Sequence, residues 1–292
     1  PIALTSHIIK VFERVMRKRL VDHLEDNNLL CNNQHGFRQG RSCLTQLLAH
    51  FDDILCNSLE GADTDAIYLD FAKAFDKVDH QLLLKKLKAF GVTGKVFQWI
   101  ESFLLDRDQY VAVNGVKSSV SKVISGVPQG TVLGPILFII FINDMNESIV
   151  SSILRSFADD TRILKAIHSY LDVPELQVDL DNIIKWSRDN NMSLHKNKFE
   201  LLQHTCPNRN IKELNELPFI SYDNSNCYST AKDSFISPSD TVKDLGVLVS
   251  ADNSWSPHIG RMINSARRTA AWVLSVFRDR SRTTMMQLYK SL

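Results

Sequence analysis

The chain has 292 residues, 44% of them hydrophobic, which is enough for the core of one large or two small domains. Its 34 basic and 33 acidic residues leave a formal net charge of +1, so bulk charge gives no indication of a nucleic-acid partner. No run reaches the roughly 18 apolar residues of a membrane helix, no signal peptide is visible, and the five cysteines lack the paired spacing of a metal site, which predicts reduced thiols in an intracellular protein.

Two amphipathic helices and a buried strand are predicted in the N-terminal part of the chain. In Thr5–Asn27, apolar residues recur at helical spacing while basic residues crowd the remaining positions. Ser42 is a suitable N-cap for a second helix, in which leucines recur at the same spacing. Ala66–Phe71 is almost entirely apolar, as expected of a central strand covered on both faces, and it carries Asp70 near its end.

The middle of the chain is predicted to combine helices with a hairpin. The predicted helices are His80–Phe90, Gly94–Leu105 and Thr131–Asn146. Gly91 ends the first of them, and the third, which follows a Gly-Val-Pro-Gln-Gly turn, is expected to be buried. Gln109–Asn114 and Ser118–Ile124 flank Gly115, which predicts two antiparallel strands joined by a turn.

The remaining elements alternate between strand and helix. A hairpin at Ile153–Leu164 precedes a helix that ends near Asn190, and residues 192–204 are predicted to return as a strand. Residues 207–240 are polar and rich in Pro, Asn and Ser, so we expect a loop-rich hairpin there. A further strand is predicted at Thr241–Val249, and a helix at Pro257–Phe277.

The end of the chain is basic although the whole is nearly neutral. From Trp255 to Leu292 there are seven basic residues and a single acid, Asp279. A basic helix can follow phosphates without reading sequence. A solvated helix face would give the same pattern, so both interpretations stay open.

Two adjacent aspartates lie in the predicted hairpin, in the sequence Phe157-Ala158-Asp159-Asp160. Their charges repel unless a cation neutralises them, and Asp70 supplies a third carboxylate. Two acids with a distant third suit a two-metal phosphoryl-transfer site, in which ions roughly 3.5–4 Å apart hold the attacking and leaving oxygens. Carboxylate oxygens favour Mg²⁺. An Asp-Asp pair is also ordinary turn chemistry, so the pair alone does not decide.

Four further motifs accompany the acidic pair. They are LDFAKAFDKVDH at 69–80, SGVPQGTVLGP at 125–135, QHGFR at 34–38 and LGV at 245–247. In order and spacing, the set resembles the reverse transcriptases of non-LTR retrotransposons, the jockey-like long interspersed elements in particular. The resemblance extends over nearly the whole chain.

The resemblance implies an α+β fold, the right-hand polymerase palm with partial fingers and the start of a helical thumb. Residues 1–65 would be partial fingers, and residues 66–250 the palm with a fingers insertion near 80–125. Residues 251–292 would be the start of a truncated thumb. Both ends of the sequence look cut, so we expect a fragment of a larger polyprotein with an endonuclease upstream.

The resemblance also assigns a metal site and a reaction. Asp70 and Asp159 would bridge two Mg²⁺ ions, with Mn²⁺ as a substitute. Asp160 and the backbone carbonyl of Phe71 would be further ligands. The implied reaction is attack of a primer 3′-hydroxyl on the α-phosphate of a deoxynucleoside triphosphate, in which the protein supplies position and charge neutralisation.

The nucleotide would be held by residues on three segments. By resemblance, Phe75 lies under the sugar and excludes a 2′-hydroxyl, whereas a core aromatic is the simpler interpretation. Gln129 and Gly130 would lie beside the incoming nucleotide and the template. Lys198 would neutralise or protonate the leaving pyrophosphate, although a surface lysine is the commoner role. Asp76 and Asp79 are expected to cap the following helix or to pair with nearby lysines.

The implied nucleic-acid contacts are spread over the chain. Arg38 and Arg41 in the fingers motif could hold template phosphates bidentately, or they could be solvated. Gly246 would lie near the primer terminus. Arg261, Arg267 and Arg268 are the arginines of the basic helix that we expect to follow the nucleic-acid backbone.

The implied function is an RNA-directed DNA polymerase of a non-LTR retrotransposon, with an RNA template, a DNA primer and deoxynucleoside triphosphates as partners and no membrane. Cytoplasmic ribonucleoprotein particles and the nucleus are the expected compartments. A degenerate or truncated copy that binds RNA without turnover is the main alternative. A group II intron maturase shares the palm, but the motif at 71–76 (FAKAFD) and Ala158 fit the retrotransposon branch better.

Overall fold

The computed structural model describes residues 5–195, 198–206, 228–231 and 234–291. The chain forms two compact units, Pro1–Ser239 and Asp240–Leu292, and each is described by itself. The second unit begins ahead of residue 251, where the thumb was predicted to start. The division into fingers, palm and thumb stays a prediction.

A four-stranded antiparallel sheet is the centre of the first unit. Its strands follow the order β6 (Ile153–Phe157), β7 (Asp160–Ile167), β1 (Asp63–Leu69) and β8 (Glu200–His204). The predicted central strand and acidic hairpin are therefore confirmed as β1 and the β6–β7 pair. Because Leu69 lies opposite Thr161, the end of β1 meets the turn between β6 and β7.

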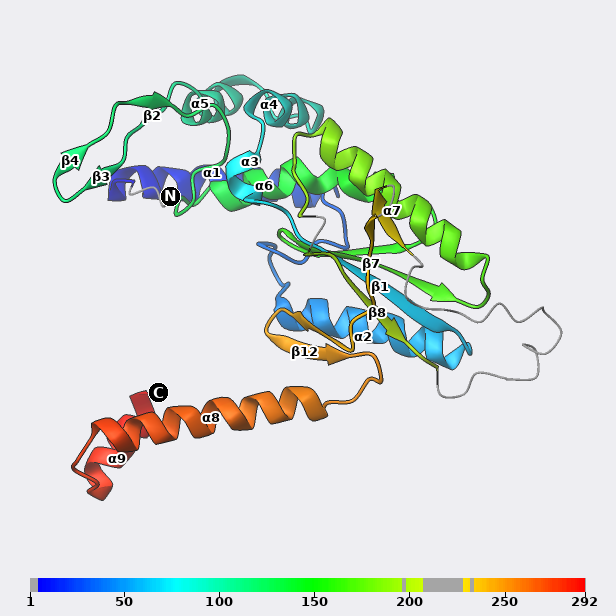
Figure 1. The fold of residues 1–292 in the computed structure, drawn as a ribbon. Helices are drawn as coiled ribbons and strands as arrows, with labels where there is room; N and C mark the ends of the chain where they lie inside the picture. The colour runs from blue at the N-terminus through cyan, green and yellow to red at the C-terminus, as the bar shows by residue number, and fades with distance from the viewer. Residues whose placement is uncertain (1–4, 196–197, 207–227, 232–233, 292) are drawn as a thin grey trace. The chain divides into compact units, whose positions relative to one another are not determined.

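Two helices cover opposite faces of this sheet, α2 (Cys43–Leu59) and α7 (Asp172–Asp189) (Figure 1). Successive side chains of β1 point to opposite faces. The Tyr68 hydroxyl lies 3.1 Å from His50 Nε2 of α2, while Ile67, which is fully buried, faces the side of α7. Cover on both faces explains why the strand is apolar along most of its length.

Further helices gather at one end of the sheet (Figure 1). They are α1 (His7–Asp26), the short α3 (Ala74–Lys77), α4 (His80–Ala89), α5 (Gly94–Leu104) and α6 (Gly134–Ile142). Asp79 is the N-cap of α4, since its Oδ1 accepts a hydrogen bond from Leu82 N at 3.0 Å. This confirms the capping role predicted for Asp79. The core clusters around α6, whose residues from Ile136 onward are at most 3% exposed.

A narrow β-ribbon connects α5 to the segment before α6. Its paired strands are β2 (Asp108–Gln109) with β5 (Ser121–Lys122), and β3 (Ala112–Val113) with β4 (Val116–Lys117). Asn114 and Gly115 at the tip have φ of +49° and +81°, as a two-residue hairpin turn requires. The predicted hairpin is confirmed, with shorter strands than expected.

Three predicted elements have different bounds. The buried helix predicted at 131–146 begins at Gly134 and continues from Asn143 as the 3₁₀ helix η1 (Asn143–Ser148). Of the strand predicted at 192–204, Glu200–His204 forms a regular strand, and residues 196–197 lie outside the described part of the chain. Most of the predicted loop-rich region 207–240 lies outside the described residues, and its described part forms a hairpin of β9 (Ser229–Ala231) and β10 (Ser234–Phe235).

The second unit is a hairpin followed by two helices. The single strand predicted at 241–249 was wrong: β11 (Thr241–Asp244) and β12 (Val247–Ser250) pair across a tight turn. Leu245 and Gly246 both have positive φ, 45° and 90°, which the pattern of alternating apolar residues did not indicate. The predicted basic helix is α8 (Ser256–Val276), and α9 (Arg282–Ser291) follows it. Throughout the part of the chain that the structure covers, no helix combines the length and apolarity needed to cross a membrane.

Candidate active site

The acidic pair lies at a strained turn between β6 and β7. Phe157 pairs with Asp160, so Ala158 and Asp159 make the connection. Ala158 has a φ of +55°, a left-handed conformation that costs a non-glycine residue about 1–2 kcal/mol. Such backbone strain persists only where the surrounding structure holds it in place.

Gln34 holds this turn from the N-terminal segment. It is 5% exposed, and its Oε1 accepts hydrogen bonds from Ala158 N at 2.8 Å and Gly36 N at 2.6 Å. Its Nε2 donates to Ala158 O at 3.3 Å. Next to it, His35 N donates to Ser156 O at 2.8 Å. Gln34 is the first residue of the QHGFR motif, but the motif alone does not indicate that this side chain supports the acidic turn.

Basic side chains surround the same segment. The His35 ring contacts Thr45 Oγ1 at 2.8 Å. Burial, and then the positive charges of Arg41 and Arg155, lower the pKa of His35 to about 4. Arg155 in turn pairs with Asp53 of α2 at 2.8 Å. The ring is therefore neutral at physiological pH and acts as a packing and hydrogen-bonding group.

Asp70 follows β1 directly and is fixed by the segment that precedes β8. His195 N donates to Asp70 O, and Ala72 N donates to Ser193 O, both at 2.8 Å. In an antiparallel pair of this kind, the intervening residue turns its own N–H and C=O to the other edge of the strand. The Phe71 carbonyl therefore faces the edge that β7 and the acidic turn occupy, as a metal ligand from Phe71 would require.

Asp70 and Asp159 act on each other electrostatically. The pKa of Asp159 is raised, first by burial and then by the negative charge of Asp70. Lys198 Nζ forms an ion pair with Asp70 Oδ2 at 2.9 Å, although the lysine side chain is 64% exposed. Asp160 is the first residue of β7 and is exposed. The structure thus brings Asp70, Asp159 and Lys198 together.

The donor set suits a divalent cation. Within the described residues, no group of three or more His, Cys, Asp or Glu side chains is already arranged to hold a metal ion. Asp70 and Asp159 still offer hard oxygen ligands, and their mutual repulsion is the kind that a cation relieves. Asp160 lies next to Asp159 in the chain. The metal-ligand roles of these residues stay predictions.

The predicted nucleotide loop lies against the segment that follows Asp70. Gly126 N donates to Val78 O at 2.8 Å, and Val127 N donates to Phe75 O at 2.9 Å. Gln129 Nε2 donates to Asp76 Oδ1 at 3.2 Å. Asp76 thus holds Gln129, a contact that neither capping nor lysine pairing had suggested. Gly130 is exposed with a φ of +87°.

Phe75 belongs to a row of three aromatic rings. It stacks on Phe138 of α6 with 4.3 Å between ring centroids, and it forms a T-shaped pair with Phe37 with 6.2 Å between centroids. Phe75 is only half buried, so a core contact on one side leaves part of the ring accessible. Packing and a contact with a sugar are therefore compatible at this position.

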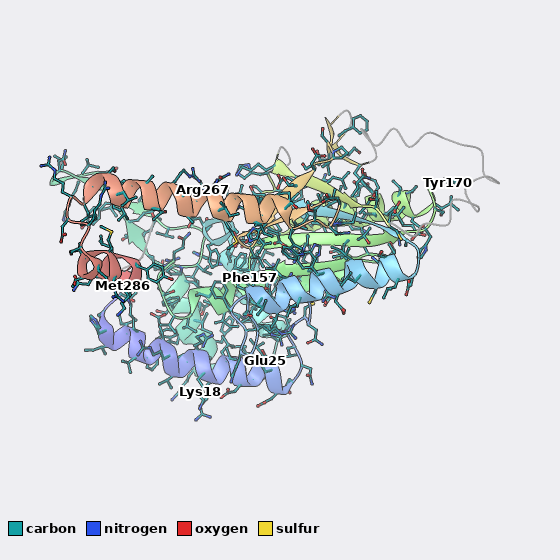
Figure 2. All side chains as sticks on the ribbon, turned by 90° about the horizontal axis from the view of Figure 1, so that it is seen from below. Lys18, Glu25, Phe157, Tyr170, Arg267 and Met286 are labelled. Carbon is teal, nitrogen blue, oxygen red and sulfur yellow. The ribbon has the colours of Figure 1, made fainter. Side chains whose placement is uncertain are left out.

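The two arginines of the segment predicted to belong to the fingers, Arg38 and Arg41, differ in how many contacts they make within the protein. Arg38 pairs bidentately with Glu25, at 3.0 and 2.6 Å, and donates to Cys31 O at 2.7 Å. Its side chain is only 7% exposed; Glu25 is labelled on α1 in Figure 2. The guanidinium is used within the protein, which argues against the predicted phosphate contact. Arg41 donates to Asn32 and is partly exposed, so it stays a candidate.

The other predicted contacts lie in the second unit. Gly246 forms the β11–β12 turn. Arg261, Arg267 and Arg268 are exposed on α8; Arg267 is labelled in Figure 2. Their nucleic-acid contacts stay predictions.

Comparison with protein-family models gives a match over residues 1–248 to the reverse transcriptase (RNA-dependent DNA polymerase) family. A probable RNA-directed DNA polymerase from the transposon X-element of Drosophila melanogaster is 28% identical over all of this chain and 31% of its own length. The RNA-directed DNA polymerase from the mobile element jockey of Drosophila funebris is also 28% identical, with the same coverage. The chain thus spans about a third of the length of these relatives.

Solved structures of telomerase have the same fold. Apo telomerase from Candida tropicalis superposes with a TM-score of 0.52 over 82% of this chain and 39% of that chain, at 10% identity. Telomerase from Candida albicans, solved with a fragment of telomeric RNA, gives 0.51 over 84% and 37%, at 12% identity. At such low identity the likeness concerns the fold, a right-hand polymerase, as predicted.

Proposed function

Because the chain belongs to the reverse transcriptase (RNA-dependent DNA polymerase) family, we propose that it carries the polymerising centre of a non-LTR retrotransposon protein. In this proposal it extends a DNA primer with deoxynucleoside triphosphates on an RNA template. The observation that carries the proposal is the meeting of Asp70 and Asp159 at the junction of β1 with the β6–β7 turn. The chain covers 31% of the length of these two relatives. For a whole protein of that length, we propose in addition an endonuclease module upstream, and action in cytoplasmic ribonucleoprotein particles and in the nucleus.

Asp70, Asp159 and Asp160, with the Phe71 carbonyl, would hold two Mg²⁺ ions. When bound, such ions neutralise charge on the transferred phosphoryl group and stabilise the attacking and leaving oxygens. Mg²⁺ prefers oxygen ligands and retains water and substrate phosphates, which agrees with a site that offers few protein side chains. Mn²⁺ would serve as a substitute.

The other residues of the site would orient the nucleotide. Phe75, fixed on Phe138, offers the accessible part of its ring to the sugar. Gln129 is held by Asp76, and Gly130, which has no side chain, would let the backbone approach the incoming nucleotide and the template closely. Lys198 reaches Asp70 on an exposed side chain, so it can turn toward the departing pyrophosphate. Positioning of this kind accounts for much of the rate of phosphoryl transfer.

Primer extension tests the proposal. The 292-residue chain is incubated with an RNA template, an annealed DNA primer, the four deoxynucleoside triphosphates and Mg²⁺. Asp159→Ala should abolish extension while RNA binding, measured in parallel, stays close to that of the unchanged chain. Extension by the Asp159→Ala protein would refute the assignment of the metal site. A folded wild-type chain that binds RNA but extends nothing would favour the alternative of an RNA-binding copy without turnover.

A further inference from the structure

Glu13 is the one fully buried acid of α1 among the residues that the structure describes. It is 0% exposed, although α1 is otherwise largely solvent-facing, with Lys18 directed outward (Figure 2). Its Oε2 accepts hydrogen bonds from Val132 N at 2.6 Å and from Leu133 N at 3.0 Å. A carboxylate that accepts from backbone N–H groups makes a strong, charge-assisted contact.

The Leu133 N–H lies at the N-cap of α6 and the Val132 N–H one residue before it, and the N-cap side chain makes no capping hydrogen bond. The N-cap residue is Leu133, whose side chain cannot accept a hydrogen bond, and a proline occupies the first turn. Gly134 N donates to Thr131 Oγ1 at 3.1 Å. The first N–H groups of a helix need acceptors, and a negative charge is favoured at this end. Glu13, 119 residues upstream of Val132, satisfies both requirements.

The contact fixes one end of the predicted nucleotide loop. The loop's other end is held at Gly126 and Val127 by the segment containing Phe75. Gln129 and Gly130 lie between these two attachments. The return of the loop is tight, since a Cβ on Gly134 would lie 2.7 Å from Pro128 O. We therefore expect a displacement of residues 132–133 to shift residues 129–130 as well.

We propose that Glu13 is a positioning residue that holds the 126–134 loop in the conformation that accepts the incoming deoxynucleoside triphosphate. The inference rests on the polymerase function proposed above and adds a determinant of nucleotide affinity outside the sequence motifs. Glu13 does not touch the nucleotide. It acts through Val132 and Leu133.

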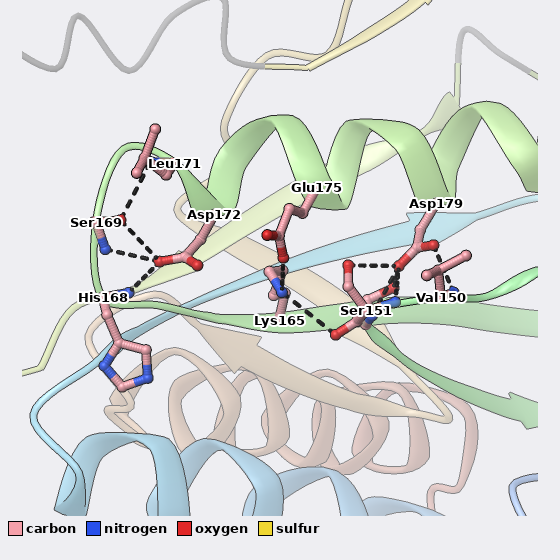
Figure 3. Close-up of polar contacts among 10 residues, drawn as sticks. Val150, Ser151, Lys165, His168, Ser169, Leu171, Asp172, Glu175 and Asp179 are labelled. Carbon is pink, nitrogen blue, oxygen red and sulfur yellow. Dashed lines mark hydrogen bonds and ion pairs between the residues drawn. The ribbon is translucent and has the colours of Figure 1, made fainter.

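The chain offers a matched control in Asp179 of α7 (Figure 3). Asp179 is likewise 0% exposed, and its carboxylate accepts from the backbone N–H groups of Val150, Ser151 and Ser152 at 2.7 to 3.0 Å. These residues precede the start of β6, at the end away from the Ala158–Asp159 turn. Removing this carboxylate should cost stability by the same mechanism without disturbing the nucleotide loop.

The experiment compares Glu13→Ala, Glu13→Gln and Asp179→Ala with the unchanged 292-residue chain. Amide hydrogen exchange is measured at residues 129–133 and 150–152, and primer extension gives KM for the deoxynucleoside triphosphate and kcat. Glu13→Ala should speed exchange at 129–133 and raise KM, each by at least about tenfold, because two charge-assisted hydrogen bonds are lost; tenfold corresponds to about 1.4 kcal/mol. Glu13→Gln keeps an acceptor oxygen but loses the charge, so it should recover only part of the loss. Asp179→Ala should speed exchange only at 150–152 and leave KM unchanged.

Exchange and turnover separate this inference from the proposed function. Unchanged exchange at 129–133 in Glu13→Ala would overturn the inference, whether or not the chain polymerises. Faster exchange with an unchanged KM in an active chain would also overturn it. A wild-type chain with no extension refutes the polymerase function instead. The exchange rates at residues 129–133 then still test whether Glu13 holds the loop.

Discussion

Gly36 offers a sharp test of how the acidic turn is held. A Cβ built on Gly36 would lie 2.2 Å from Ala158 N and 2.9 Å from Ala158 Cα, whereas real Cβ atoms essentially never come within 3.0 Å. The Cβ would also lie 2.9 Å from Gln34 Oε1, but the two Ala158 atoms are backbone, so no side-chain rotation relieves the contact with them. The Gly36→Ala substitution must therefore displace either the 34–36 segment or the strained turn at Ala158.

The expected effect follows from the size of the overlap. Bringing the Cβ to an ordinary contact requires a shift of about 1 Å, and a misplacement of about 1 Å costs on the order of 10²-fold in rate. Overpacking of this kind destabilises a protein by about 1–3 kcal/mol. We expect Gly36→Ala to fold with a lowered melting temperature and to extend primers about a hundredfold more slowly. Gln34 cannot compensate, because it is bonded to both Gly36 and Ala158.

Gly40→Ala is the control, since Gly40 lies in the same segment but an added Cβ there strains the backbone instead of clashing with Ala158. Its φ is +73°, so alanine is strained there, but nothing lies within 4 Å of the added Cβ. It should lose about 1–2 kcal/mol of stability from that strain and keep its extension rate. Thermal unfolding and single-turnover primer extension are measured on both variants. A Gly36→Ala protein that extends as fast as Gly40→Ala would falsify the view that this segment sets the position of the acidic turn.

Three further predictions concern single side chains of the site. Phe75→Ala should raise ribonucleotide incorporation relative to deoxynucleotide incorporation, and an unchanged ratio would remove Phe75 from the role of sugar gate. Asp159→Asn should raise the melting temperature of the chain in EDTA at neutral pH, because burial and Asp70 raise the folded-state pKa of Asp159. Ionisation of Asp159 then costs the wild-type chain stability as pH rises through that raised pKa. The difference in melting temperature between Asp159→Asn and wild type should therefore vanish at a pH below the unfolded-state pKa. A lower melting temperature of Asp159→Asn at neutral pH would contradict this reasoning. Lys198→Gln should change stability by less than about 1 kcal/mol, since its ion pair is exposed, yet slow turnover on the order of 10²-fold; equal turnover would leave Lys198 as a surface residue.

Much of the regular structure follows from local sequence. The apolar run before Asp70 indicated a strand covered on both faces, and β1 is one because α2 and α7 cover it. Ser42 predicted the start of α2, where its hydroxyl accepts from Thr45 N at 3.2 Å. The β11–β12 hairpin was missed, because Leu245 adopts a positive φ that leucine rarely shows. Periodicity carries no signal for such a turn.

Contacts between side chains that are distant in sequence could not be predicted from local sequence. Arg38 looked like a phosphate ligand by residue type, but Glu25 on α1 lies within reach and occupies it. Asp76 looked like a cap and instead holds Gln129. Each outcome depends on which elements become neighbours after folding. Residue type and spacing limit the candidates, and tertiary contacts choose among them.

The same reasoning gives the N-terminal segment a role that its motifs did not indicate. The two irregular parts of the site, the Ala158–Asp159 turn and the 126–134 loop, are each held by one buried polar side chain from this segment, Gln34 and Glu13 respectively. A strained φ beside two repelling carboxylates is unfavourable by itself and needs outside support. Because both supports precede β1 in the chain, substitutions of Gln34 or Glu13 should impair positioning at the site while the aspartates themselves remain intact.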